Sequence, residues 1–106
     1  MRIEIYWTAL KNGITEAEIR AILNNYELRI SIPTREEGIE ADDYFYVGRA
    51  AANEPHIEVI ADHIDPEVAQ VFHAMMLKRN SVRELGLRRF IKPDFARQRR
   101  QRKRRE

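Results

Sequence analysis

The sequence predicts a small α+β domain with an antiparallel sheet of about four to five strands. Three observations support this class. The chain of 106 residues is long enough for one domain. Several short segments alternate apolar and polar residues, which is typical of half-buried strands. A helical pattern precedes most of these segments and a shorter one follows them, so we expect an N-terminal helix on one face of the sheet and a short C-terminal helix.

The first third of the chain predicts a strand, a helix and a second strand. Residues 2–7 alternate with period two. Thr15 with Glu18 three positions later matches a capping box, and apolar residues follow at helical spacing until about residue 24. Residues 28–32 alternate again and end at a proline, as expected for a strand. Residues 34–43 are expected to form an acidic loop.

The rest of the domain predicts three more strands and a short helix. Ser81 is expected to cap a helix that ends at Leu85, and Pro93 is expected to end the ordered part. One domain over residues 1–92 and a basic, disordered tail over 93–106 are therefore predicted. The three strands cover residues 44–47, 56–60 and 68–77. The apolar residues expected to face the N-terminal helix are Leu28, Ile30, Ile32, Phe45, Val47, Ile57, Val59 and Ala61.

Charge is divided unevenly along the chain. Residues 1–77 contain 6 Lys and Arg against 14 Asp and Glu, a net charge of −8, whereas residues 78–106 contain 13 against 3, a net charge of +10. The run from residue 97 to 105 is dominated by arginine and predicts salt-dependent binding to nucleic-acid backbones. Two alternatives are a solubilising tail and an arm that folds back onto the acidic body.

Several classes of protein are disfavoured by what the sequence lacks. There is no cysteine, which excludes disulfides and cysteine-based zinc sites and fits a cytoplasmic protein. No apolar run approaches the ~20 residues of a membrane span, and the N-terminus lacks the apolar core of a signal peptide. No phosphate loop, zinc signature or serine-hydrolase motif is present, so no cofactor and no metal is expected.

The face of the sheet opposite the helix is the candidate site. If Phe45 points toward the helix, Tyr44 and Tyr46 lie on the other face, together with His56 and Glu58. The tyrosines could stack on bases, and Glu58 could orient a histidine. Each of these residues can equally be an ordinary strand residue.

The expected hairpin register adds a second histidine to this face. Pairing Ala61 with Val68 across the 62–67 turn sets His56 opposite His73. A slip of one residue would move His73 to the other face. Imidazole titrates near neutrality and can act as general base or acid when RNA is cleaved through its own 2′-hydroxyl. His63 lies in the turn and is expected to be exposed.

Three short segments resemble a known toxin family. They are Trp7 to Glu18, Tyr46-Val-Gly-Arg49, and Val71 to Met75 followed by Lys78 and Arg79. They resemble the BrnT-type toxins of bacterial type II toxin–antitoxin pairs, within the RelE-like ribonucleases. Asn12 stands where the family has histidine, and His73-Ala-Met75 replaces its Ser-Ala-Arg motif. Only Arg49 and Arg79 therefore carry over, as phosphate binders. The resemblance implies a cognate antitoxin and cleavage of cellular RNA, on or off the ribosome.

Two functional hypotheses follow. The first is a metal-independent endoribonuclease in which His73 acts with His56 or Glu58. The second is a non-catalytic module that binds nucleic acid or the ribosome through its tail. The residues expected to contact phosphate or RNA are Arg49, Lys78, Arg79, Arg83, Tyr44, Tyr46, Arg97, Arg99, Arg100, Arg102, Lys103, Arg104 and Arg105.

Overall fold

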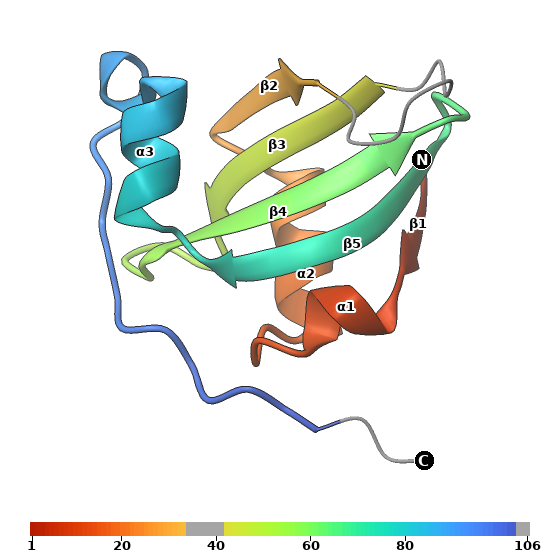
Figure 1. Ribbon diagram of the computed structural model, residues 1–106, viewed down its shortest axis with the longest axis horizontal. Helices are drawn as coiled ribbons and strands as arrows, with labels where there is room; N and C mark the ends of the chain where they lie inside the picture. Colours follow the sequence, from red (N-terminus) through yellow and green to blue (C-terminus); the bar gives the residue numbers. More distant parts are fainter. Residues whose placement is uncertain (34–41, 104–106) are drawn as a thin grey trace.

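A computed structural model describes residues 1–33 and 42–103 of the chain. It confirms the α+β class, with a five-stranded mixed sheet and helices near both ends of the chain (Figure 1). The elements in chain order are β1 (Arg2–Ile5), α1 (Trp7–Leu10), α2 (Glu16–Asn24), β2 (Leu28–Ile32), β3 (Asp42–Arg49), β4 (His56–His63), β5 (Val68–Met76), α3 (Arg79–Leu85) and the 3-10 helix η1 (Leu87–Arg89).

The sheet has the strand order β1-β5-β4-β3-β2. Strands β2 to β5 form the expected antiparallel meander, but β1 pairs with β5 in parallel, with Ile3 opposite Ala69. The two helices between β1 and β2 carry the chain across the sheet, which makes a parallel pairing at the far edge possible. The first strand is also shorter than predicted, because Trp7 begins helix α1.

Helix α2 begins at the predicted capping box. The Thr15 hydroxyl accepts a hydrogen bond from the Glu18 amide at 3.1 Å, and the Glu18 carboxylate accepts one from the Thr15 amide at 3.0 Å. These bonds satisfy amides at the helix start that have no partner within the helix. Ile19, Ile22 and Leu23 are buried against the sheet, as their helical spacing predicts.

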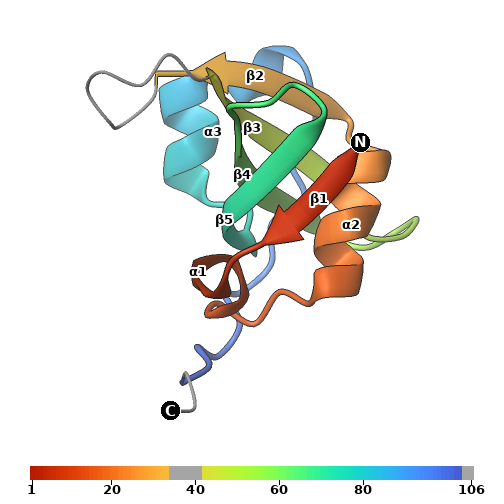
Figure 2. The ribbon, with the colours of Figure 1, turned by 90° about the vertical axis from the view of Figure 1, so that its right-hand side faces the viewer.

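Helices cover both faces of the sheet. Figure 2 shows α2 on one side of the sheet and α3 on the other. Ile57, Val59 and Ala61 pack on the α2 side, as predicted. The predicted facing of the other five residues is wrong, because they pack on the α3 side; these are Leu28, Ile30, Ile32, Phe45 and Val47. Alternation along a strand separates two faces but does not say which helix covers each one.

The C-terminal segment is extended and lies against the domain. We call residues 93–103 the arm. It runs past α3 and then toward α1 (Figure 1). The Gln98 amide donates to the carbonyl of Met76 at 2.8 Å, and the Arg102 backbone amide donates to the carbonyl of Lys11 at 2.7 Å. Of the arrangements considered for the tail, the described part adopts the one that folds back on the body.

Candidate functional site

A fully buried carboxylate on the α3 face of the sheet is the centre of the candidate site. Glu58, in β4, has none of its surface exposed. Its Oε1 accepts hydrogen bonds from the backbone amide of Lys78 at 2.9 Å and from the hydroxyl of Ser81 at 2.8 Å. Its Oε2 contacts His73 Nε2 at 2.8 Å, and the Lys78 ammonium lies 3.6 Å away. One side chain thus joins strand β5 and the start of α3.

Glu58 is ionised in this environment. Burial raises the pKa of a carboxyl group, but the hydrogen bonds from His73, Lys78 and Ser81 and the charge of Lys78 hold the pKa of Glu58 below its ordinary value. A buried carboxylate that remains charged attracts a proton donor strongly, because little solvent screens it. His73 is that donor, so its Nε2 carries a proton toward Glu58.

His73 is brought to Glu58 by a bulge in β5. Ile60 pairs with His73 whereas Ala61 pairs with Val71, which leaves Phe72 as an extra residue on β5. The imidazole is 21% exposed, and among the described residues nothing hydrogen-bonds to its Nδ1. The ring therefore has one nitrogen oriented by Glu58 and a second that makes no hydrogen bond within the described residues.

The predicted pairing of His56 with His73 is wrong. In the structure Ala61 pairs with Val71, and not with Val68, and His73 pairs with Ile60. Strand β4 continues to His63 and β5 begins at Val68. The turn between them is therefore shorter, and begins later in the chain, than the predicted 62–67 turn. Glu58, which was the other partner considered for His73, makes the contact instead.

His56 holds the arm and is not available for chemistry. It is 1% exposed, and its Nδ1 accepts a hydrogen bond from the backbone amide of Asp94 at 2.9 Å. An amide can only donate, so the proton of the neutral ring lies on Nε2, which donates to Glu27. Both nitrogens are therefore occupied within the protein.

The two tyrosines predicted for the site lie on the opposite face. Tyr46 pairs with Val59, is 1% exposed and packs in the α2-side core, so its predicted exposure is wrong. Its hydroxyl contacts His63 Nε2 at 2.7 Å. His63 is partly buried at the end of β4 and was expected to be exposed; burial and then the charge of Arg29 lower its pKa. Tyr44 packs beside the same core, where the Arg29 guanidinium covers its ring at 4.6 Å.

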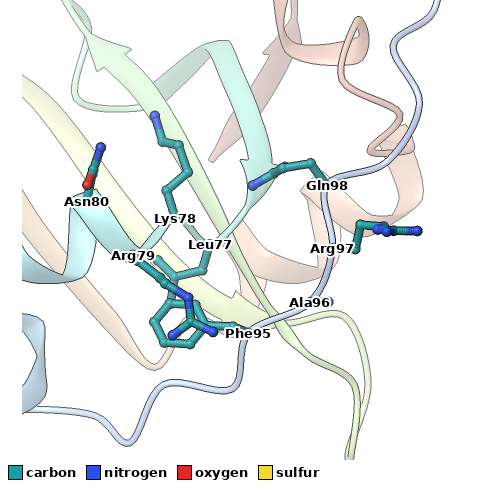
Figure 3. Close-up of a pocket in the computed structure, with 8 residues that line it drawn as sticks. All are labelled: Leu77, Lys78, Arg79, Asn80, Phe95, Ala96, Arg97 and Gln98. Carbon is teal, nitrogen blue, oxygen red and sulfur yellow. The ribbon is translucent and has the colours of Figure 1, made fainter.

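Basic residues line an open hollow beside Glu58. It has a volume of about 550 Å³, and Lys78 and Arg79 belong to its lining, as does Arg97 of the arm. Figure 3 shows the Arg79 guanidinium over the ring of Phe95, at 4.2 Å from its centre, and the Gln98 side chain turned toward β5. The link after β5, the start of α3 and the arm together line this hollow.

The other predicted phosphate binders differ in how their charges are balanced. Arg49 contacts Asp94 at 3.1 Å and Glu27 at 3.6 Å, and Arg99 forms a two-pronged ion pair with Glu18. Arg83 donates to the side chain of Asn80. Arg100, Arg102 and Lys103 are exposed along the arm, whereas Arg104 and Arg105 lie outside the described residues.

Several contacts of this region were not anticipated from the sequence. Glu27 and Asp94, which hold His56, lie 29 and 38 residues away from it along the chain. Ser81 was expected to cap a helix, but α3 begins at Arg79 and Ser81 lies inside it, where its hydroxyl binds Glu58 from 23 residues away. No local pattern marks such pairs, because the contacts exist only once the sheet and arm are assembled.

In residues 1–33 and 42–103, no three histidine, aspartate or glutamate side chains gather in a way that would hold a metal ion. Within the same residues, no helix has the length and apolarity needed to cross a membrane.

Comparison of the chain with protein-family models, with curated proteins and with solved structures found no significant match.

Proposed function

We propose that this protein is a metal-independent endoribonuclease in which His73 is the proton acceptor, Glu58 orients it, and Lys78 stabilises the transition state. The observation that supports this most is the buried, ionised Glu58 bound to a histidine whose Nδ1 has no partner among the described residues. A carboxylate that fixes the tautomer of a histidine leaves its other nitrogen ready to take a proton.

The proposed reaction needs only groups of the protein and solvent. The 2′-hydroxyl of a nucleotide gives its proton to His73 Nδ1 while its oxygen bonds to the adjacent phosphorus. The bond from phosphorus to the 5′-oxygen breaks, and that oxygen leaves with a proton from solvent. Lys78, which is 41% exposed in its side chain, is close enough to Glu58 to face the phosphate as negative charge develops. Arg79 and Arg97 line the neighbouring hollow and would bind the flanking phosphates.

The resemblance to BrnT-type toxins adds two expectations about the cellular setting. The enzyme would act on cellular RNA in the cytoplasm, and a cognate antitoxin would block it. The acidic part of the domain offers a surface for such a partner, since residues 1–77 carry a net charge of −8.

The first experiment is inducible expression in bacteria, with growth and total RNA integrity recorded together, followed by assay of the purified protein with RNA in the presence of a chelator. His73→Ala should reduce cleavage by about 10²- to 10⁴-fold, the range found when a general base is removed. His63→Gln is the matched control, because His63 is another partly buried histidine on the opposite face. It should retain cleavage.

Either of two results would contradict the proposal. One is equal cleavage by wild type and by well-folded His73→Ala protein. The other is wild-type protein that leaves RNA intact and growth normal. The second result would favour a binding module, for which the exposed basic residues Arg97, Arg100, Arg102 and Lys103 of the arm provide the specific support.

A further inference from the structure

Helix α3 and η1 carry four arginines that have no carboxylate partner among the described residues: Arg79, Arg83, Arg88 and Arg89. We call these four residues the arginine ridge. Three other arginines, Arg2, Arg49 and Arg99, each form an ion pair. The one acid within the segment, Glu84, forms no ion pair within the described part of the chain.

Uncharged groups hold three of these guanidinium groups in place. Arg83 donates to the Asn80 side chain at 2.8 Å, and Arg79 lies over the ring of Phe95. Arg89 donates to the carbonyl of Gly86 at 3.4 Å and lies 5.4 Å from the centre of the Phe90 ring. Neutral partners orient a guanidinium without cancelling its charge, so the ridge keeps its full attraction for an anion.

Gly86 brings the two halves of the ridge together. It ends α3 with φ +62°, a left-handed conformation that lets the chain turn at once into η1. A Cβ at this position would meet Arg89 Nη2 at 3.2 Å. The turn thereby sets the arginines of η1 beside those of α3, around a hollow of about 480 Å³ that Val82 also lines.

The ridge continues toward the proposed reacting groups. Arg79 lines both this hollow and the one that contains Lys78 and Arg97. A polyanion lying along the ridge would therefore be directed to Lys78, which contacts Glu58 and adjoins His73. A chain of regularly spaced phosphates suits this arrangement better than a single small anion.

An exposed aromatic ring beside the ridge indicates the kind of polyanion. Phe90 follows η1 directly and is 58% exposed. The Arg89 guanidinium lies 5.4 Å from the centre of its ring, and the exposed remainder is open to a partner. Unpaired bases stack on such rings, whereas bases within a duplex are already stacked and are not accessible.

From these contacts we infer that the arginine ridge and Phe90 bind single-stranded RNA and deliver it to the His73 site. This inference rests on the proposed ribonuclease function and adds the class of substrate. The arginines bind phosphates and Phe90 stacks on a base. Arg79 lies between the ridge and Lys78, so a bound strand would extend from one to the other.

The test measures binding apart from cleavage. Fluorescence anisotropy would follow full-length protein with a short 2′-O-methyl RNA, which cannot be cleaved, as a single strand and as a duplex of the same sequence. Phe90→Ser should weaken single-strand binding at least about fivefold, given the usual strength of base stacking. Arg88→Gln should weaken it about threefold or more, by loss of one phosphate contact. Arg20→Gln removes one exposed charge on α2, on the opposite face, and should change little.

The outcomes separate this inference from the proposed function. His73→Ala protein should bind the uncleavable strand as wild type does, so a failed cleavage mechanism would leave the binding result standing. Unchanged affinity in both Phe90→Ser and Arg88→Gln would overturn the inference and leave an acidic protein as the partner of the ridge. Equal affinity for duplex and single strand would also overturn it.

Discussion

At the scale of single residues, Glu58 is a fully buried carboxylate that depends on its hydrogen-bond partners. A buried carboxylate is costly unless it is well hydrogen-bonded. Its two oxygens receive three hydrogen bonds, from His73, Lys78 and Ser81, and the Lys78 ammonium adds an opposite charge. These contacts outweigh burial, so the pKa of Glu58 falls below its ordinary value of 4.5.

This shift predicts how stability depends on pH. Between the lowered folded-state pKa and about 4.5, the unfolded chain binds a proton at Glu58 that the folded protein does not. Glu58 should therefore contribute its full stabilisation above this pH range. The free energy of unfolding should fall as the pH drops through the range. Denaturant unfolding at several pH values between about 3 and 6 measures this dependence.

Glu58→Gln tests the assignment. The variant should lose about 1–3 kcal/mol of stability at neutral pH, because an amide cannot accept all three hydrogen bonds. Its stability should depend less on acid pH than that of the wild type. Some dependence should remain, since the hydrogen bond to Arg99 also lowers the pKa of Glu18. Parallel pH profiles for the two proteins would show that folding does not lower the pKa of Glu58.

At the scale of elements, the arm is attached at several points along its length. Its start is bound by His56 and its middle by Met76 and Glu18. The His56 contact is buried, whereas the Arg99–Glu18 pair is partly exposed, with side chains 37% and 20% accessible. Buried hydrogen bonds are usually worth more than exposed ion pairs, so the start of the arm should be the stronger attachment.

Replacing His56 by Leu should release the arm. The variant leaves the amide of Asp94 without its side-chain acceptor, and we expect a loss of about 1–3 kcal/mol in the free energy of unfolding. Trypsin should then cleave after Arg97 and its neighbours sooner than in the wild type. Arg99→Gln, the control, should cost at most about 1 kcal/mol. Equal rates of proteolysis in wild type and His56→Leu would contradict this view of the arm.

At the scale of the whole molecule, the basic C-terminal part of the chain meets the acidic body at a few ion pairs and otherwise keeps its charges exposed. Ion pairs join the arm to the body through Asp94 and Arg99. They leave the arginines of α3 and η1 and several residues of the arm exposed, and these lie along the same C-terminal part of the chain. This arrangement favours attraction of a polyanion to α3, η1 and the arm.

RNA binding should consequently be sensitive to salt. A plot of log affinity against log salt concentration should fall with a slope of about 0.7 for each phosphate contacted on a single strand. Replacing Arg97, Arg100 and Arg102 together by Gln should reduce this slope by up to about 2. An unchanged slope would show that the arm does not contact RNA.

Local sequence determined the elements of this protein. Apolar alternation marked the strands that became β2, β4 and β5, and Thr15 with Glu18 marked the start of α2. These signals work because the interacting groups lie within four residues of each other, or because one side of a strand must be apolar. The division of charge was also visible in the sequence, and it needs no fold to exist.

Tertiary structure alone decided where the chemistry lies. The parallel pairing of β1, the bulge at Phe72 and the choice of face for Tyr46 each depend on contacts between distant segments. The hairpin register sets His73 opposite Ile60 and away from His56, and the one extra residue in β5 puts His73 on the same face as Glu58. The physical reason is that side-chain alternation has a period of two, so register and facing are settled by packing across the whole sheet and not by the pattern of any one strand.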